Sequence, residues 1–343
     1  MSDHSPVPEP IIIIIDGYQQ TFTRNRMKQN RREFIGTVAS AGLFLPFQSS
    51  SLSIPQGNAQ EKFPLRLFSK PIDNYDFGFM CECVKRSGLG GFDLTVRPAG
   101  KVEPATVETD LPPLVERARK YNLALDMIVT GIVNATDPLS ESVLKTASSL
   151  GVTHYRLGYL DFDLKAGIWQ SLQRYKEDLK GLADLNQKYR IHGDYQNHAG
   201  TRVGCSVWDL FEMLRDHPPE HIGCQYDVRH AMVEGANAWI IGMRLISGLI
   251  GSLAIKDFTW MTVDGRPRAV TVPMGEGMVN WDLFFRTVKE LNISGPITLH
   301  VEYPLFEKDE EKLPLGQQQE IIVRKIKKDT DYIKNYLEKY QLI

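Results

Sequence analysis

The sequence Tyr226-Asp227-Val228-Arg229-His230 ends a short β-prone run at groups that can bind a metal ion or move a proton. Two further segments have the same form, GDYQNH at residues 193–198 and TLHVEY at residues 298–303. In a barrel of parallel strands, the C-terminal strand ends meet at one rim, where the chemistry of such folds takes place. These three segments therefore predict a barrel with a polar site at its C-terminal rim.

Strand-like and helix-like segments alternate along the chain from about residue 63 onward. Amphipathic periodicity predicts helices at Leu111–Tyr121, Leu139–Leu150 and Ile168–Lys188, and a long charged helix at about 317–339. Asp110 and Ser206 are expected to cap helices, and Gly151, Gly223 and Gly295 to follow them. Eight strands are expected, at Leu65–Ser69, Gly91–Val96, Ala124–Thr130, Thr153–Tyr159, Ile191–Gln196, Gly223–Asp227, Ser252–Asp257 and Ile297–Glu302.

This count and length predict an α/β fold, a single (β/α)8 TIM barrel over residues 61–343. An open, doubly wound sheet is the main alternative. It is disfavoured because no Gly-x-Gly-x-x-Gly follows the first strand and the alternation continues without a break.

Residues 1–60 differ in kind from the rest of the chain. The segment NRREFIG at 30–36 precedes a mild apolar run at 37–47 and a Ser/Pro/Gln-rich spacer. This order predicts a twin-arginine signal and export to the periplasm. A disordered tail that contains an Arg-Arg pair is the alternative. Met1 and Met27 are both candidate starts, because a signal begins close to its arginines.

Composition excludes several classes of function. The 343 residues carry a net charge of −2 and no basic block, so nucleic acid is not expected as a partner. The N-terminal apolar run is too short for a permanent membrane span. The four cysteines match neither a zinc ribbon nor a C-x-x-C motif and are expected to be small buried residues.

Period-two alternation decides which polar side chains face the barrel interior. His300 and Glu302 share a face, whereas Lys256 and Asp257 point to opposite sides, so only one of that pair lines the interior. A lysine buried there needs a carboxylate partner or a lowered pKa. Lys256 is therefore either a salt-bridged structural residue or a group that stabilises an enolate oxygen.

Several of these residues also have ordinary structural interpretations. Asp227 would often be a helix cap, and His300 a buried histidine in the core. Phe258 and Trp260 either wall a sugar-sized pocket or belong to the core. It is the combination of polar groups at four strand ends that favours a functional site.

Four motifs together resemble the sugar phosphate isomerase/epimerase superfamily, the xylose isomerase-like barrels. They are Gly275-Glu276-Gly277, Asn197-His198, Asp227-x-x-His230 and Ile255-Lys256-Asp257, and the match covers about residues 63–305. The resemblance implies a (β/α)8 fold and often one divalent cation, usually manganese, cobalt, zinc or magnesium. It also implies removal of a proton next to a carbonyl, which gives an enediolate.

The ligand pattern of that superfamily is only partly present. It places Glu, Asp, His and Glu at the ends of strands five to eight; here Asp227 fits, but Gln196 and Ala254 stand at the first and third positions. The last position aligns with His300 or Glu302. Two interpretations follow: a weaker metal site of Asp227, His300 and Gln196 or His198, or no metal, with Lys256 and Arg97 or Arg156 supplying positive charge.

The sequence thus predicts an exported isomerase or epimerase that abstracts a proton next to the carbonyl of a sugar or keto-sugar. A lyase or dehydratase, and a non-catalytic sugar-binding barrel, are the alternatives; a homo-oligomer is left open, and hydrolysis of a phosphoester is disfavoured because the rim offers too few ligands. The expected catalytic residues are His230, Lys256 and Glu302. The expected substrate-binding residues are Arg97, Arg156, Asn197, His198, Asp257 and Glu276, and the expected metal ligands are Asp227, His300 and Gln196.

Overall fold

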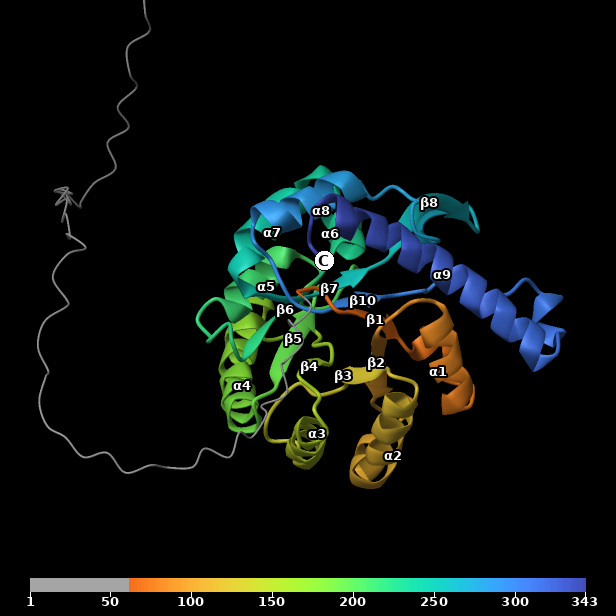
Figure 1. Ribbon diagram of the computed structural model, residues 1–343. Helices are drawn as coiled ribbons and strands as arrows, with labels where there is room; N and C mark the ends of the chain where they lie inside the picture. Colours follow the sequence, from red (N-terminus) through yellow and green to blue (C-terminus); the bar gives the residue numbers. More distant parts are fainter. Residues whose placement is uncertain (1–61) are drawn as a thin grey trace, which may run out of the picture. The chain divides into compact units, whose positions relative to one another are not determined.

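The computed structural model describes residues 62–343, so the expected signal segment lies outside the described residues. Within them, eight parallel strands close into a barrel in the order β1-β10-β7-β6-β5-β4-β3-β2 (Figure 1). The predicted (β/α)8 barrel is therefore confirmed. The barrel strands are β1 Leu65–Phe68, β2 Gly91–Val96, β3 Ala124–Thr130, β4 His154–Arg156, β5 His192–Gln196, β6 Ile222–Asp227, β7 Ile250–Ile255 and β10 Ile297–Leu299.

Helices surround the barrel, and the last of them lies beside the first, so that the ring is complete (Figure 1). Short 3-10 turns occur at Lys70–Ile72, Pro104–Thr106, Ala236–Ala238, Ser247–Leu249 and Glu310–Lys312. The α-helices are α1 Phe77–Arg86, α2 Val107–Lys120, α3 Pro138–Ser149, α4 Ile168–Tyr189, α5 Val207–Leu214, α6 Val228–Gly235, α7 Trp239–Ile246, α8 Trp281–Glu290 and α9 Leu315–Lys339.

Most of the strands are rich in apolar residues, which are buried between the barrel interior and the helices. The polar residues within them, such as Asp93 and Gln225, are buried as well. Every residue of β2 and of β6 is buried. Ser206 caps α5 as expected, because its side chain accepts the N–H of Trp208. The expectation for Asp110 is wrong: α2 begins earlier, at Val107, where a 3-10 turn leads into it.

Gly223 does not follow a helix but lies within β6. A Cβ at this position would lie 2.5 Å from the carbonyl oxygen of Leu249, so the close approach of two backbone segments requires glycine. Gly151 and Gly295 do occupy turns with positive φ, 95° and 127°.

An antiparallel hairpin interrupts the alternation after β7. Its strands are β8 Asp257–Val263 and β9 Arg266–Val272. Asp264 and Gly265 form its turn with φ of 52° and 71°, the values of a tight type I′ turn. Trp260 lies on this hairpin and is 47% exposed, so it does not belong to the core, whereas Phe258 is buried.

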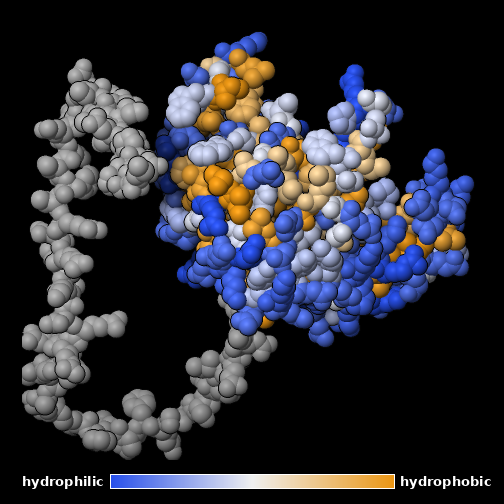
Figure 2. All heavy atoms as spheres, turned by 90° about the horizontal axis from the view of Figure 1, so that it is seen from above, coloured by the Kyte–Doolittle hydropathy of each residue, from blue (hydrophilic) through white to orange (hydrophobic). Residues whose placement is uncertain are grey.

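The surface seen in Figure 2 has separate hydrophobic areas divided by hydrophilic residues. Among residues 62–343, no helix is both long and apolar enough to cross a bilayer. Cys81, Cys83 and Cys224 are buried and Cys205 is partly buried, and all four are free thiols.

Candidate active site

Three charged side chains from different strand ends meet at the C-terminal mouth of the barrel. Lys256 directly follows β7, Asp227 ends β6, and Glu302 lies just after β10. The Lys256 Nζ is 2.7 Å from Glu302 Oε2 and 3.3 Å from Asp227 Oδ2. Lys256 and Asp227 are buried, whereas the Glu302 side chain is 29% exposed. The mouth therefore holds a buried ammonium between two carboxylates.

The oxygens of Asp227 contact only hydrogen-bond donors. Oδ1 accepts the backbone N–H of His230 at 3.1 Å, which caps α6, and Oδ2 accepts the Gln196 amide at 2.9 Å. The Asn197 side chain holds the backbone of this residue, accepting its N–H at 2.7 Å and donating to its carbonyl at 2.9 Å. Asp227 is therefore both the cap of α6 and a charged member of the group at the barrel mouth. Asn197 therefore positions Asp227 through both ends of its amide.

The orientation of the Gln196 amide follows from its other neighbours. Its Oε1 accepts Arg156 Nη1 at 2.9 Å and the Tyr159 hydroxyl at 2.6 Å. A guanidinium can only donate, so Oε1 must face Arg156 and Nε2 must face Asp227. Gln196 therefore presents a donor, not a ligand oxygen, to the carboxylate of Asp227.

Two histidines stack at the mouth with different ring nitrogens protonated. The rings of His198 and His230 have centroids 3.8 Å apart. His198 Nδ1 lies 2.9 Å from the Ala199 carbonyl, an acceptor, so Nδ1 carries the proton and Nε2 the lone pair. His230 Nδ1 lies 3.0 Å from Arg229 Nη1, a donor, so Nε2 carries the proton. That His230 N–H has no hydrogen-bond partner.

His300 and Arg97 both lie against Phe68. The His300 ring stacks on it at a centroid distance of 4.4 Å, and Arg97 lies over the ring at 5.8 Å. The Nδ1 of His300 is 3.8 Å from Glu302 Oε1, and neither of its ring nitrogens has a hydrogen-bond partner. His300 therefore borders the ammonium–carboxylate group without binding it tightly, whereas the contact that Arg97 makes here is with Phe68.

The charges of this group set the protonation states of its members. Burial alone would lower the pKa of Lys256, but the nearby carboxylates Asp227 and Glu302 outweigh it and raise that pKa. Burial would raise the pKa of Glu302, but His300 and the Lys256 ammonium hold it well below its usual range. The lysine is therefore charged and Glu302 is ionised at neutral pH.

The three histidines at the mouth are neutral because burial and the nearby positive charge both lower their pKa. Burial, followed by the charge of Lys256, lowers the pKa of His198, of His230 and, with Glu302 opposing, of His300. Deeper in the barrel, burial raises the pKa of the Asp93 carboxyl to about 7 although Arg156 opposes the shift. Neutral imidazoles beside a fixed positive charge are suited to proton transfer.

Two expected substrate-binding residues lie outside this group. Asp257 points to the opposite side from Lys256, as the alternation requires, and its carboxylate accepts the N–H groups of Gly275, Gly277 and Val279 and the Trp281 indole. The glycines of this loop thus bring the backbone close to Asp257, not to a substrate. Glu276 is exposed and pairs with Lys328 of α9.

The predicted ligands of a divalent cation are Asp227, Gln196 and His300. They do come together, but the ammonium of Lys256 already lies on Asp227 Oδ2, and Gln196 turns its N–H toward the same oxygen. Among the described residues, no three His, Cys, Asp or Glu side chains are arranged to hold a metal ion. The donor set present therefore does not fit a divalent cation.

A hollow of about 450 Å³ opens beside Glu302. It is lined by Lys70, Tyr303 and Phe306 among others, which gives it one basic and two aromatic walls. Tyr159 and Arg229 are functional neighbours that the sequence analysis missed. Tyr159 could have been found, because it lies just beyond β4 like the other rim residues, whereas nothing in the sequence indicates that Arg229 binds the ring of His230.

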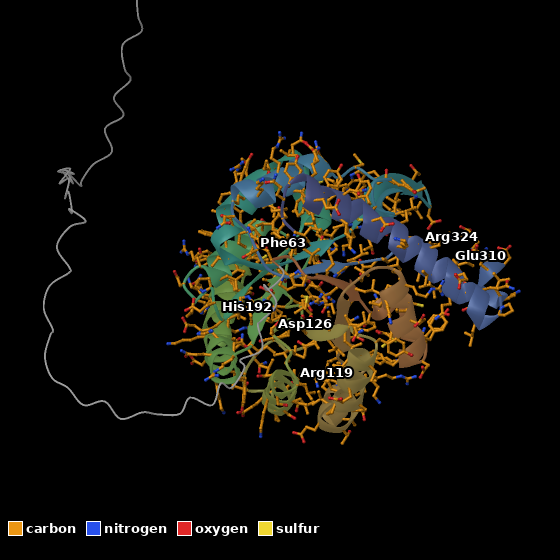
Figure 3. All side chains as sticks on the ribbon, viewed as in Figure 1. Phe63, Arg119, Asp126, His192, Glu310 and Arg324 are labelled. Atoms are coloured by element: carbon orange, nitrogen blue, oxygen red, sulfur yellow. The ribbon has the colours of Figure 1, made fainter. Side chains whose placement is uncertain are left out.

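A second buried polar group, the N-terminal cluster, lies at the other end of the barrel and consists of Arg66, Asp126, His192, Asp194 and Ser252. Arg66 binds both oxygens of Asp126 at 2.6 Å. Asp194 contacts His192 Nε2 at 2.9 Å and accepts Ser252 Oγ at 2.7 Å. Figure 3 shows Asp126 and His192 near the barrel strands, whereas Arg324 lies on α9 and Glu310 in the short turn before that helix.

The closed barrel and its polar mouth define the class of protein: a (β/α)8 barrel with an ionic site at the C-terminal strand ends. Residues 81–325 match the family model described as xylose isomerase-like TIM barrel. The chain belongs to this family.

Solved structures share the fold. A D-allulose 3-epimerase from Methylomonas sp. has 15% identity and a TM-score of 0.59, covering 81% of this chain and 99% of that one. A probable 3-DHS dehydratase from Bacillus anthracis has 14% identity and a TM-score of 0.58, with coverages of 77% and 98%. A 3-keto-D-glucoside 4-epimerase from E. coli has 11% identity and a TM-score of 0.55, with coverages of 77% and 99%. No curated protein matches the chain.

Proposed function

We propose that this protein is an isomerase or epimerase that moves a proton on the carbon next to the carbonyl of a keto-sugar. The observation that carries the proposal is the ammonium of Lys256, fixed beside two neutral histidines of opposite tautomer. Sugar epimerases and a dehydratase among the structures of the same fold support a carbohydrate substrate.

The N–H donors at the mouth of the barrel can stabilise the negative charge of an enolate oxygen. An ammonium has three N–H groups, and Lys256 uses two of them on Glu302 and Asp227. The third, together with the unpartnered Nε2–H of His230, is available to a substrate oxygen. When the carbon–hydrogen bond breaks, its electron pair moves into the carbonyl group, and the negative charge that develops on oxygen is stabilised by these donors.

The proton acceptor is His198 in this proposal. Its Nε2 carries a lone pair, and its lowered pKa keeps the imidazole neutral at neutral pH. The expected base Glu302 is less suitable, because Lys256 and His300 hold its pKa so low that it binds a proton weakly. Glu302 instead holds the ammonium in place.

Return of the proton completes the reaction in either of two forms. A proton supplied by solvent to the opposite face of the enediolate inverts the carbon, and the proton on His198 is then released to solvent. Return of the His198 proton to the neighbouring carbon, with transfer of the hydroxyl proton between the two oxygens, moves the carbonyl. If a hydroxyl lies β to the carbanion, its departure as water with the proton that His198 has taken up gives the dehydratase alternative. In that alternative the Nε2–H of His230 remains a donor to the enolate oxygen.

Export, which the predicted signal segment supports, bears on the substrate. We propose a free sugar, glycoside or 3-keto-sugar, because phosphorylated sugars are mainly cytoplasmic. The hollow beside Glu302, with aromatic Tyr303 and Phe306, offers apolar walls of the kind that contact sugar rings.

The test is solvent deuterium exchange. Incubation with a panel of keto-sugars in D₂O should put deuterium next to the carbonyl, as followed by proton NMR. Lys256→Met is the negative variant. Lys120→Met, which changes an exposed lysine at the C-terminal end of α2 that does not line the hollow, is the positive control. Sugars that bind but exchange no proton would identify a sugar-binding barrel and overturn the proposed activity.

A further inference from the structure

We propose that the ammonium of Lys256 takes the place of a divalent cation in this barrel, and that removing it creates a cation site. This inference goes beyond the proposed function, because it concerns what the mouth of the barrel binds and does not depend on the reaction. It rests on the contacts of three side chains and on one amide orientation.

The first observation is the position of the ammonium. Lys256 Nζ lies between carboxylates supplied by two different strand ends, 3.3 Å from Asp227 Oδ2 and 2.7 Å from Glu302 Oε2. The lysine side chain is 2% exposed. A divalent cation is bound by converging carboxylates such as these, one buried at the end of β6 and one partly exposed just after β10, and here the ammonium of the chain itself satisfies them.

The second observation is the loss of ligand atoms around that position. Gln196 directs its amide N–H₂ to Asp227, and it cannot flip because its Oε1 is held by Arg156, which only donates. Ala254, on β7 two residues before the lysine, has no ligand atom. Asp227 therefore has the Gln196 amide, a hydrogen-bond donor, on one side and the methyl group of Ala254 on the other.

Electrostatics then excludes a second cation. A divalent ion bound to Asp227 Oδ2 would lie beside the buried ammonium with little water between them, and like charges at that separation repel strongly.

Removal of the lysine makes binding of a divalent cation favourable. Lys256→Ala leaves Asp227 Oδ2 and Glu302 without their counter-charge and opens the volume of the lysine side chain. His300 Nδ1, 3.8 Å from Glu302 Oε1 and without a hydrogen-bond partner, is a third ligand atom at the same place. In wild type these three side chains are not arranged to hold a metal ion. With the lysine gone they can draw together around Co²⁺, Zn²⁺ or Mn²⁺, for which two carboxylates and an imidazole are suitable ligands.

The experiment uses Co²⁺ as the probe and needs no substrate. Visible absorption of bound Co²⁺ and the shift in melting temperature are measured for wild type, K256A, K256A/D227N and the control K70A, with circular dichroism as the check of folding. We expect K256A to bind Co²⁺ at least about 100-fold more tightly than wild type, because its buried positive charge is gone. K70A should behave as wild type, and K256A/D227N should lose the gain.

Wild type alone provides an independent test, should K256A fail to fold. Protein produced with manganese and cobalt in the medium should contain far less than one metal per chain, and EDTA should not change its melting temperature. Stoichiometric metal in wild type that D227N removes would overturn the inference, as would a folded K256A that binds Co²⁺ no better than wild type. Failure of keto-sugar exchange would leave this result untouched, and so the two proposals fail separately.

Discussion

The two ends of the barrel contain buried ionic groups of opposite character. At the N-terminal cluster, Arg66 binds Asp126 through two hydrogen bonds, and both oxygens of Asp194 have partners. At the C-terminal mouth, His230 Nε2 and both ring nitrogens of His300 lack partners although they are buried. Buried polar atoms without partners are costly, so they persist where a ligand will complete them.

This difference separates structure from function within one fold. The N-terminal cluster is fully hydrogen-bonded and stabilises the barrel by itself. The unpaired histidine nitrogens at the mouth are available to bind a ligand. Substitutions at the N-terminal cluster should therefore change the free energy of unfolding, and substitutions at the mouth should change catalysis. Each prediction below tests that division.

The largest effect is expected for Lys256→Met. Loss of the ammonium removes the main group that stabilises the developing oxyanion, so kcat/KM should fall by about 10³ or more. Steady-state kinetics on the keto-sugar that exchanges deuterium fastest gives the measurement. Arg66→Met is the control at the other end: it should lower the melting temperature and leave kcat per folded enzyme unchanged. A Lys256→Met enzyme with wild-type turnover would remove the lysine from the mechanism.

His198→Gln should lower kcat by about 10² to 10⁴ with little change in KM, because the proton acceptor is lost and the substrate contacts remain. His192→Gln, its counterpart at the N-terminal cluster, should keep kcat. Equal losses in the two variants would show that the division between the ends is wrong.

The pH dependence of kcat/KM provides another test of His198 as the proton acceptor. Burial and the charge of Lys256 lower the pKa of His198, Asp227 and Glu302 oppose this, and neutral His230 adds no charge. His198 acts as an acceptor only when unprotonated, so kcat/KM should be level at neutral pH. It should fall on acidification with an apparent pKa below the ordinary 6.5 of histidine. An acid limb above that value would contradict the assignment.

Asp194→Asn should lower the free energy of unfolding at mildly acid pH by about 3–5 kcal/mol, because it breaks a buried ion pair. Burial would raise the pKa of Asp194, but His192 lowers it, so its stabilisation is present above pH 3.8 and is lost as the pH falls through the lowered value. Burial would lower the pKa of His192, but Asp194 raises it, so that contribution is present below pH 6.5 and is lost as the pH rises through the raised value.

The difference between wild type and Asp194→Asn should therefore be greatest between about pH 4 and about pH 6.5. Urea unfolding across that range provides the measurement, with kcat per folded enzyme as the control. A difference that does not vary with pH would mean that the histidine is not charged in the folded protein.

The smallest effect is expected for Glu276→Gln. Its carboxylate pairs with Lys328 at the surface, and an exposed pair contributes at most about 1 kcal/mol. Activity should be unchanged, as measured under the conditions used for Lys256→Met. A large loss of activity would return Glu276 to the substrate-binding residues.

Much of the fold could be predicted from sequence because hydrophobic pattern and strand length are local properties. The bounds of β2 and β3 agree with the prediction, whereas β4 and β10 are shorter and end at Arg156 and Leu299. The hairpin β8–β9 was missed although Asp264-Gly265 between β-prone runs is a strong hairpin signal.

From the sequence, the site could be predicted only as a set of polar residues at neighbouring strand ends. The sequence places Asp227, Lys256 and Glu302 at one rim, but it does not say that the ammonium bridges both carboxylates. The orientation of Gln196 depends on Arg156 from a neighbouring strand, a contact that no local pattern encodes. The same holds for Asn197, whose side chain is used on the backbone of Asp227.

Closure of the sheet has a consequence for how the chain folds. β1 pairs with β10, which joins Leu65 to Ile297, and that seam cannot form until nearly the whole polypeptide has been synthesised. Contacts between residues so distant in sequence slow folding, because loop entropy is lost before the contact repays it. A nascent chain that stops before Ile297 should thus remain protease-sensitive, with the edges of β1 and β7 exposed to unwanted pairing.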